Sequence, residues 1–263
     1  RYDGFAREMN KRGIVVFCDD HRGHGETDPG RTGYSEGDMW NGTLKDLAAL
    51  NKIYREKYPE LPYVIFGHSY GSFLTQRYIE LYGDTVDAAV IGGSAYLKDF
   101  SVVAARFVAK WNCFFGKGDK PAELIKKLSF DKYNKIYDDG TTFISQLPEE
   151  CRRYEKAEDC NFTLSNNFYK SFFSGLPKTY KAKNYSKIPS DLPLLLVAGD
   201  GDPVGGYGKL MEKLYRFYKE KVGVKSVKKV IYPKVRHEYL NDTSREAVKK
   251  EIADFAESIK KRV

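Results

Sequence analysis

The chain has 263 residues, of which 41% are hydrophobic and 30% are charged, and its formal net charge is +8. This balance is that of a folded globular protein with a substantial buried core, and it excludes a disordered or fibrous chain. The longest apolar runs, such as residues 193–198, have the length of a β-strand and fall well short of the roughly 20 residues that a membrane-spanning helix needs.

The first third of the chain alternates between helical and strand-like segments. Helices are predicted at residues 2–11, 40–58 and 69–82, of which the first ends at Gly13 and the second before Pro59. Strands are predicted at residues 14–19, 63–66 and 86–92, where apolar, β-branched runs suggest burial. A glycine-rich loop over residues 21–37 follows the first strand.

The pattern changes at residue 96. Residues 96–187 have little strand character, and strands resume at residues 194–198 and 227–232, with helices at 207–221 and 243–261. Alternating strands and helices indicate an α/β fold with a mostly parallel sheet, flanked by helices and with its active site at the carboxyl ends of the strands. We therefore expect a core formed by residues 1–95 and 188–263, and a helical cap over that edge formed by residues 96–187.

Aromatic residues are frequent in the predicted cap. Any one of them is expected to pack in the interior, but a few should line a pocket large enough for an acyl chain. If the helix predicted at residues 101–115 gates that pocket, it should be more mobile than the sheet. The aromatic residues in question are Phe107, Trp111, Phe114, Phe115, Phe143, Phe162, Phe168, Phe172 and Phe173.

The positive charge is concentrated in helix-like stretches, as at Lys249, Lys250, Lys260 and Lys261. Solvated helix faces explain such lysines, and the alternative is attraction to anionic substrates or to an anionic membrane surface. No basic and aromatic motif of the kind that binds nucleic acid is present, so we expect no nucleic-acid partner.

Four cysteines in a chain of this length do not form a disulfide framework. Cys18 ends an apolar run and is expected to be a buried thiol, while Cys151 and Cys160 are near enough in sequence for a disulfide to be considered. The absence of CxxC pairs and of metal-ligand spacing predicts no metal or other cofactor. A reduced, cytoplasmic protein is the expectation, with membrane association as an open alternative.

The sharpest motif is Gly67-His68-Ser69-Tyr70-Gly71, which lies between a predicted strand and a predicted helix. A nucleophilic serine needs a sharp turn at this point so that its hydroxyl stands clear of the backbone, and both glycines are expected to permit close packing there. The amino terminus of the following helix also favours developing negative charge. The motif therefore predicts Ser69 as a nucleophile.

A serine hydroxyl needs a base to take its proton, and the chain has four histidines. His68 lies within the turn itself, and its side chain cannot readily fold back. His21 and His24 belong to the loop after the first strand, which they are expected to hold by hydrogen bonds. His237 follows the last strand, where a chain order of Ser, Asp, His places the base.

The histidine in turn needs a carboxylate to fix its tautomer. Asp200 and Asp202 both follow the strand at residues 194–198. Pro203 favours an extended conformation at Asp202, which makes Asp202 the better candidate. Asp200 is expected to accept hydrogen bonds from loop amides.

These residues resemble those of the monoacylglycerol lipase and lysophospholipase group of α/β-hydrolases, related to the serine aminopeptidases. The resemblance runs along the whole chain, including the helical cap and the stretch Leu240-Asn241-Asp242. The matching motifs are Asp20-His21-Arg22-Gly23-His24-Gly25, Gly67-His68-Ser69-Tyr70-Gly71, Gly199-Asp200-Gly201-Asp202-Pro203-Val204 and Arg236-His237-Glu238.

The resemblance implies a serine esterase acting on a single-chain acyl lipid, either a monoacylglycerol or a lysophospholipid. Ser69 would attack the ester, His237 would transfer the proton, Asp202 would orient His237, and the backbone amide of Tyr70 would be one oxyanion donor. The partner would be a small acyl ester, and transient contact with a membrane surface stays the open alternative that the positive charge suggests.

Family members carry a strand and a His-Gly loop before the helix that opens this chain, and that loop supplies the second oxyanion amide. The chain begins at Arg1-Tyr2-Asp3-Gly4-Phe5. We therefore expect a fragment of a longer protein, and we expect a gap in the sheet between the first two strands seen here.

Other activities share this arrangement of residues. A short-chain esterase or a peptidase could use the same triad, with the cap deciding between them, and an α/β-hydrolase fold can also serve as a non-catalytic binding module. Epoxide and haloalkane hydrolases are disfavoured because they use an aspartate where this chain has Ser69.

Overall fold

Four parallel strands form the sheet in a computed structural model, which describes residues 1–137 and 139–262. The strands are β1 (Val64–His68), β2 (Ala88–Gly92), β3 (Leu194–Gly199) and β4 (Val227–Tyr232), and they lie side by side in that order. The register aligns Gly67 of β1 with Ile91 of β2. Positions 138 and 263, which fall within the predicted cap and core, lie outside the described residues.

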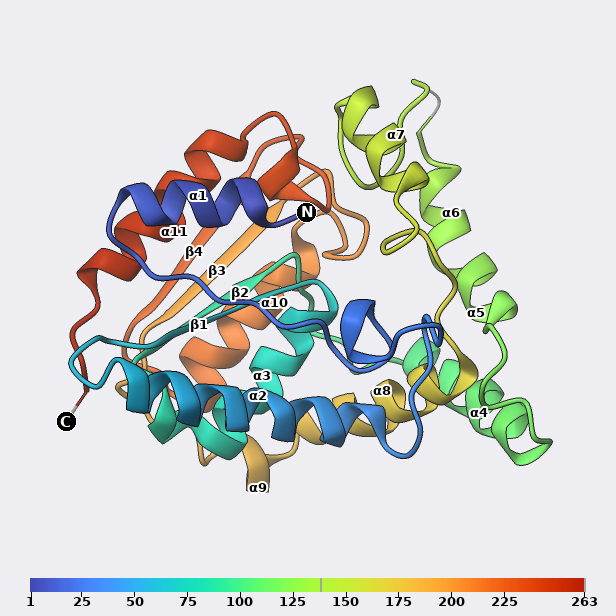
Figure 1. The fold of residues 1–263 in the computed structure, drawn as a ribbon, viewed down its shortest axis with the longest axis horizontal. Coiled ribbons are helices and arrows are strands. Elements are labelled where there is room, and N and C mark those ends of the chain that lie inside the picture. The colour runs from blue at the N-terminus through green and yellow to red at the C-terminus, as the bar shows by residue number, and fades with distance from the viewer. Residues whose placement is uncertain (138, 263) are drawn as a thin grey trace.

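Helices cover both faces of this sheet (Figure 1). One face carries α1 (Asp3–Lys11) and α11 (Arg245–Ser258); the other carries α2 (Met39–Lys57), α3 (Tyr70–Tyr82) and α10 (Lys209–Arg216), the last continued by a π-helical turn over Phe217–Val222. The α/β fold predicted from the alternation of elements is therefore confirmed.

Strands β2 and β3 are buried and apolar on both sides because each side meets a helix layer. Ile91 and Leu196 belong to the core beneath α2, α3 and α10, whereas Val90, Leu195 and Val197 belong to the core beneath α1 and α11. Near-continuous apolar runs of this kind are typical of buried parallel strands, which explains why the sequence locates β2 and β3 well.

Between β2 and β3 the described residues contribute helices and no strand of the sheet. These helices are α4 (Phe100–Phe114), α5 (Glu123–Leu128), α6 (Phe130–Asn134), α7 (Pro148–Lys156), α8 (Asn166–Thr179) and α9 (Ala182–Tyr185). Figure 1 shows α4 to α7 gathered at one end of the molecule, while α8 runs back along α2 and α3. The division into a core and a separate cap stays a prediction.

The strand predicted at residues 14–19 is wrong. This segment is extended but pairs with no strand of the sheet, and a cavity lined by Val16 and Phe17 from the segment and by Val64 and Phe66 from β1 lies where a gap was expected. Without a neighbouring strand, its backbone has no ladder partner. For the same reason Cys18 is exposed, and the prediction of a buried thiol there is also wrong.

The predicted packing of the cap aromatics is correct for some and wrong for others. Phe143, Phe168 and Phe172 are buried, but on α4 the side chains of Phe107 and Phe114 are 66% and 83% exposed. Helix α4 packs against α8 through its opposite face, where small residues such as Ala109 are buried. Its aromatic face is therefore left in solvent. Among the described helices, none is both long enough and apolar enough to cross a bilayer.

Candidate active site

Ser69 lies at the turn between β1 and α3, with φ 52° and ψ −120°. This positive φ is strained for a residue with a side chain, and such strain is stored where the surrounding structure enforces it. Gly67 permits the turn, because a Cβ there would lie 2.2 Å from the carbonyl oxygen of Gly71 and 2.3 Å from Oγ1 of Thr75. The turn projects the serine hydroxyl from the carboxyl end of β1.

The expectation that both glycines of the motif are needed for close packing holds at one position only. A Cβ added to Gly71 would meet no atom within 4 Å, because the close approach is made by Gly67 to the backbone of residue 71. Gly71 lies instead on the wall of the cavity, where a side chain would take up open space.

His237 reaches Ser69 from the loop after β4. Its Nε2 lies 2.8 Å from the Oγ of Ser69, which is hydrogen-bonding distance. The two residues are far apart in the sequence, and they meet because both follow the carboxyl ends of parallel strands. His237 is 4% exposed, so its imidazole is shielded from bulk water, whereas Ser69 is half-buried.

Asp202 completes the chain of hydrogen bonds from the loop after β3. Its Oδ2 accepts a hydrogen bond from Nδ1 of His237 at 2.9 Å, and its Oδ1 accepts one from the backbone amide of Val204 at 2.8 Å. The carboxylate is fully buried. Asp200 faces away and accepts from the amide of Lys234, which is the loop-holding contact predicted for it.

The surroundings shift the pKa values of two neighbouring histidines, His237 and His68, in opposite directions. Burial lowers the pKa of His237, but the charge and hydrogen bond of Asp202 outweigh burial, and the pKa is raised above its ordinary value. For His68, burial and the nearby His237 both lower the pKa well below the ordinary value. The ring of His68 lies 5.0 Å from that of His237, and as a neutral group it adds no competing charge.

His21 and His24 hold their own loop, as predicted. Nδ1 of His21 lies 2.8 Å from the carboxylate of Asp19, and Nδ1 of His24 lies 3.1 Å from the carbonyl oxygen of Arg22. Neither histidine has a hydrogen bond to Ser69 in the described residues. Their rings flank the cavity rather than the triad.

A contact that the sequence does not reveal holds the His237 loop from the other side. The amide of His237 donates to the carbonyl oxygen of Phe143 at 3.0 Å, and the amide of Glu238 donates to that of Ile144 at 2.8 Å. Phe143 and Ile144 lie in the segment between α6 and α7, more than ninety residues earlier in the chain. No local pattern marks them, because backbone acceptors are independent of residue type.

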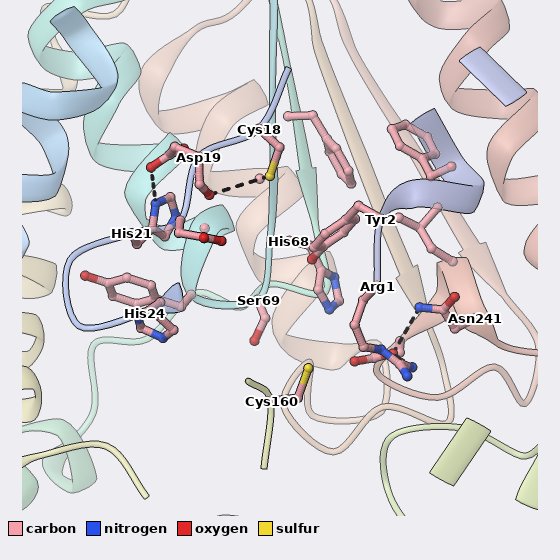
Figure 2. A pocket seen from close by; sticks show the side chains of 18 of the residues that line it. Arg1, Tyr2, Cys18, Asp19, His21, His24, His68, Ser69, Cys160 and Asn241 are labelled. Atoms are coloured by element: carbon pink, nitrogen blue, oxygen red, sulfur yellow. Dashed lines mark hydrogen bonds and ion pairs between the residues drawn. The ribbon is translucent and has the colours of Figure 1, made fainter. Parts of the chain in front are cut away.

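Ser69 opens into a cavity of about 1160 Å³. Figure 2 shows its hydroxyl pointing into this space, with His21 and His24 to one side, Arg1 and Asn241 to the other, and Cys160 facing it. The cavity walls near α6 to α8 include Phe130, Phe143, Phe162, Leu164 and Tyr169, so two of the predicted cap aromatics line it. Among the described residues, no cluster of three or more His, Cys, Asp or Glu side chains has the arrangement of a metal site.

The family model described as "Serine aminopeptidase, S33" matches residues 1–244. Among curated proteins, the monoglyceride lipase of Rattus norvegicus is 31% identical over 75 residues, which cover 28% of this chain and 24% of that protein. The monoacylglycerol lipase of Mycolicibacterium smegmatis is 30% identical over 95 residues, which cover 36% of this chain and 33% of that protein. The chain thus matches a quarter to a third of the length of these relatives.

A solved structure resembles the chain over nearly its whole length. The thermostable carboxyl esterase from Bacillus coagulans, crystallised with glycerol, superposes with a TM-score of 0.88 at 28% identity, covering 98% of this chain and 85% of the esterase. The family match and this likeness agree with the fold and with the resemblance inferred from the motifs.

Proposed function

The chain belongs to the serine aminopeptidase S33 family of α/β-hydrolases, and from that premise we propose that it is a serine hydrolase cleaving the carboxylic esters of single-chain acyl lipids. The single observation that carries the proposal is the unbroken line of hydrogen bonds from Ser69 through His237 to Asp202. Substrates are monoacylglycerols or lysophospholipids.

In the first half of the reaction, Oγ of Ser69 attacks the ester carbonyl carbon while Nε2 of His237 takes the hydroxyl proton. The negative charge that develops on the carbonyl oxygen is stabilised by the backbone amide of Tyr70, the first residue of α3, because amides in the first turn of a helix have no intrahelical acceptor. His237 then donates its proton to the leaving alcohol, and the acyl group stays on Ser69.

In the second half, His237 takes a proton from water as the water oxygen attacks the acyl-enzyme carbonyl. Collapse of that intermediate breaks the bond to Ser69, which recovers its proton from His237, and the fatty acid leaves. Asp202 stays ionised throughout, stabilises the imidazolium that forms twice per cycle, and fixes the tautomer in which Nδ1 carries the proton.

The cavity supports an acyl chain as the substrate group. Apolar side chains such as Phe143, Phe162 and Leu164 line the part of the cavity formed by the residues between β2 and β3. The two curated relatives are named for monoacylglycerol hydrolysis. Carboxylates of Asp131 and Glu155 line it as well, which favours a peptidase acting on a free amino terminus as the second candidate.

The exposed face of α4 supports transient contact with a membrane surface, from which such lipids would be taken. Phe107, Trp111 and Phe114 lie on this face, and the exposed Lys110 and Lys117 lie within a few residues of them in the sequence. Aromatic side chains insert at the level of lipid headgroups, and lysines are attracted to anionic lipids. All four cysteines are free thiols in the structure. The cytoplasmic location expected from the cysteine content stays a prediction.

A hydrolysis panel tests this proposal. Monoacylglycerols, lysophospholipids, short p-nitrophenyl esters and aminoacyl amides are compared for wild-type protein and for Ser69→Ala. The proposal predicts the highest kcat/KM for the single-chain lipids and none above background for Ser69→Ala. Preference for aminoacyl amides would favour the peptidase, and preference for short esters a short-chain esterase. Absence of turnover together with absence of fluorophosphonate labelling would indicate a binding module.

A further inference from the structure

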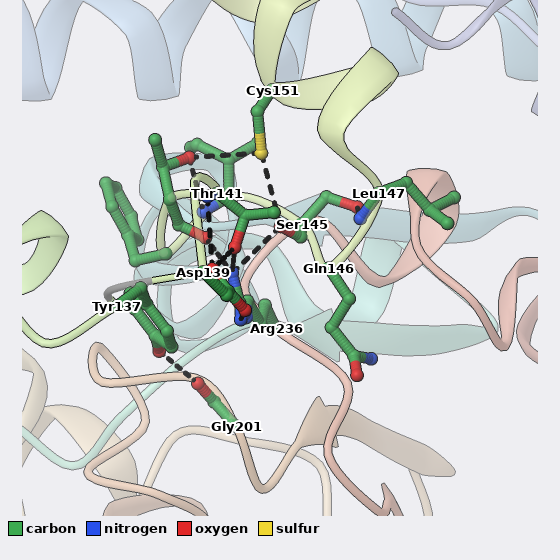
Figure 3. A network of polar contacts seen from close by, with 12 residues as sticks. Tyr137, Asp139, Thr141, Ser145, Gln146, Leu147, Cys151, Gly201 and Arg236 are labelled. Atoms are coloured by element: carbon green, nitrogen blue, oxygen red, sulfur yellow. Dashed lines mark hydrogen bonds and ion pairs between the residues drawn. The ribbon is translucent and has the colours of Figure 1, made fainter.

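Arg236, the residue before His237, has its guanidinium buried in the segment formed by residues 139–145 (Figure 3). Its Nη1 donates to the carbonyl oxygens of Thr142 at 2.8 Å and of Ser145 at 3.1 Å, and also contacts the hydroxyl of Thr141. Its Nη2 donates to the carboxylate of Asp139 at 2.7 Å. The Arg236 side chain therefore contacts four hydrogen-bond acceptors of this segment.

The same guanidinium is linked to the loop that carries Asp202. It lies 3.9 Å from the centre of the Tyr137 ring, and the hydroxyl of Tyr137 donates to the carbonyl oxygen of Gly201 at 2.7 Å. Gly201 immediately precedes Asp202, so the contacts of Arg236 reach both loops of the proposed triad.

A buried carboxylate secures the other end of the segment. Asp242 is fully buried and accepts hydrogen bonds from the amide of Arg236 at 2.6 Å and from the amide of Gln146 at 2.9 Å. It also accepts from the hydroxyl of Ser145 at 3.1 Å. The backbone on either side of His237 is thus tied to residues 145 and 146.

These ties determine where the imidazole of His237 sits. The carbonyl oxygen of Phe143, which accepts from the amide of His237, belongs to the segment that Arg236 gathers, and the Phe143 ring lies 5.6 Å from the imidazole ring. If the segment moves, the acceptor of the His237 amide and one wall of its ring move with it.

We propose that Arg236 is a positioning residue for His237, because it docks residues 139–145 onto the loops that carry His237 and Asp202. The inference rests on the proposed function of the triad. Arg236 touches neither Ser69 nor the reacting atoms, and it acts only through the geometry of the His237–Asp202 pair.

Arginine suits this role better than lysine. The guanidinium offers five donors in a rigid plane, whereas an ammonium offers three from a single point and cannot reach four acceptors spread over residues 139–145. The titratable groups that face the imidazole are Asp202, His68 and Glu238, and the Arg236 side chain has no hydrogen bond to any of them. Arg236→Lys therefore keeps the positive charge but cannot form the full set of hydrogen bonds to residues 139–145.

The test compares Arg236→Lys and Arg236→Ala with Arg55→Lys and Arg55→Ala. Arg55 is a matched control, because it forms a 2.9 Å ion pair with the buried Asp87 outside the candidate site. We expect both Arg236 variants to lower kcat for a p-nitrophenyl ester by roughly 10- to 100-fold per folded molecule, with KM changed by less than about threefold. The acid limb of the kcat/KM profile should move to lower pH, since a looser contact with Asp202 favours the imidazolium less.

A merely structural role predicts a different result, in which the variants unfold more easily but keep the kcat and pH profile of the wild type once folded. That result for Arg236→Lys would overturn the proposal. If Arg236→Ala does not fold, Thr141→Val replaces it, because this change removes one acceptor of the guanidinium and preserves the shape of the side chain. Thr141→Val should also lower kcat, and an unchanged kcat would overturn the proposal.

Titration of the His237 imidazole by NMR separates this inference from the proposed function. If the wild-type protein neither turns over esters nor reacts with a fluorophosphonate, the proposed function fails. The midpoint of His237 should still be lower in Arg236→Lys than in the wild type if Arg236 positions the ring. An unchanged midpoint would refute the positioning role whether or not the protein is a hydrolase.

Discussion

Replacing Asp202 with asparagine isolates the role of the carboxylate with almost no change in shape. The two oxygens of Asp202 have different partners, because Oδ2 accepts from Nδ1 of His237 and Oδ1 accepts from the amide of Val204. An asparagine has one acceptor and one donor for these two positions. If the oxygen faces Val204, the amide group faces His237 and stabilises the tautomer with the proton on Nε2, which cannot accept a proton from Ser69.

The opposite orientation of the asparagine is also unfavourable. It would aim the NH₂ group at the amide N–H of Val204 in a fully buried site, where leaving even one of these two donors unsatisfied costs about 1–3 kcal/mol. The productive orientation is then populated roughly 5- to 150-fold less, since 1.4 kcal/mol is a factor of ten. Loss of the charge that stabilises the imidazolium reduces the rate further. In serine proteases the corresponding change lowers kcat about 10⁴-fold, and we expect a loss of about 10³- to 10⁴-fold here.

The assay is hydrolysis of a p-nitrophenyl ester near neutral pH, with Asp200→Asn as the matched control in the same loop. Asp200 contacts the amide of Lys234 rather than His237, so its variant should stay within about threefold of the wild type. A loss of less than tenfold for Asp202→Asn, in folded protein, would refute the role assigned to Asp202.

Three further predictions follow from other features of the structure. Because the pKa of His237 is raised and the base must be neutral, kcat/KM should fall as pH is lowered, with a midpoint above the ordinary histidine value of about 6.5; a midpoint below that value would contradict the assignment. Gly67→Ala should lower the free energy of unfolding by about 1–3 kcal/mol in urea titrations, whereas Gly71→Ala should change it by less than about 0.5 kcal/mol, and equal effects would show that the turn is not the cause. The double variant Phe107→Ser and Phe114→Ser should bind less to vesicles of phosphatidylserine and phosphatidylcholine in a sedimentation assay without loss of p-nitrophenyl acetate hydrolysis, and unchanged binding would remove α4 as the membrane contact.

The sequence predicts the sheet well where burial on both faces leaves a continuous apolar run. Strands β2 and β3 are such runs, and their positions follow from residues alone. The run at residues 14–19 is also largely apolar, yet it forms no strand, because ladder formation depends on a neighbour at the right distance. The composition of a segment indicates its tendency to form a strand but does not show whether a partner strand lies beside it.

The proximity of the three candidate side chains could be predicted because they follow strands of one parallel sheet. Ser69, Asp202 and His237 come after β1, β3 and β4, and the topology alone brings the ends of those strands to one edge. The supporting contacts could not be predicted in this way. Arg236 is visible beside His237, but its acceptors in residues 139–145 belong to an irregular segment whose path no periodic pattern specifies.

The aromatic residues between β2 and β3 illustrate a second limit. Phe114 and Phe168 are the same residue type on helices of the same insertion, and one is exposed while the other is buried. Helix α4 packs against α8 through the face that carries small residues such as Ala109. From the sequence alone, the face that carries the aromatic residues would be expected to be the buried one.

The most direct test is the reaction of the protein with a fluorophosphonate, followed by mass spectrometry of the labelled peptide. The assignment of Ser69 as nucleophile and His237 as base predicts one covalent adduct on the hydroxyl of Ser69 in the wild type, and labelling about 10²- to 10⁴-fold slower in His237→Gln. An adduct on any other residue, or labelling of His237→Gln at the wild-type rate, would contradict it.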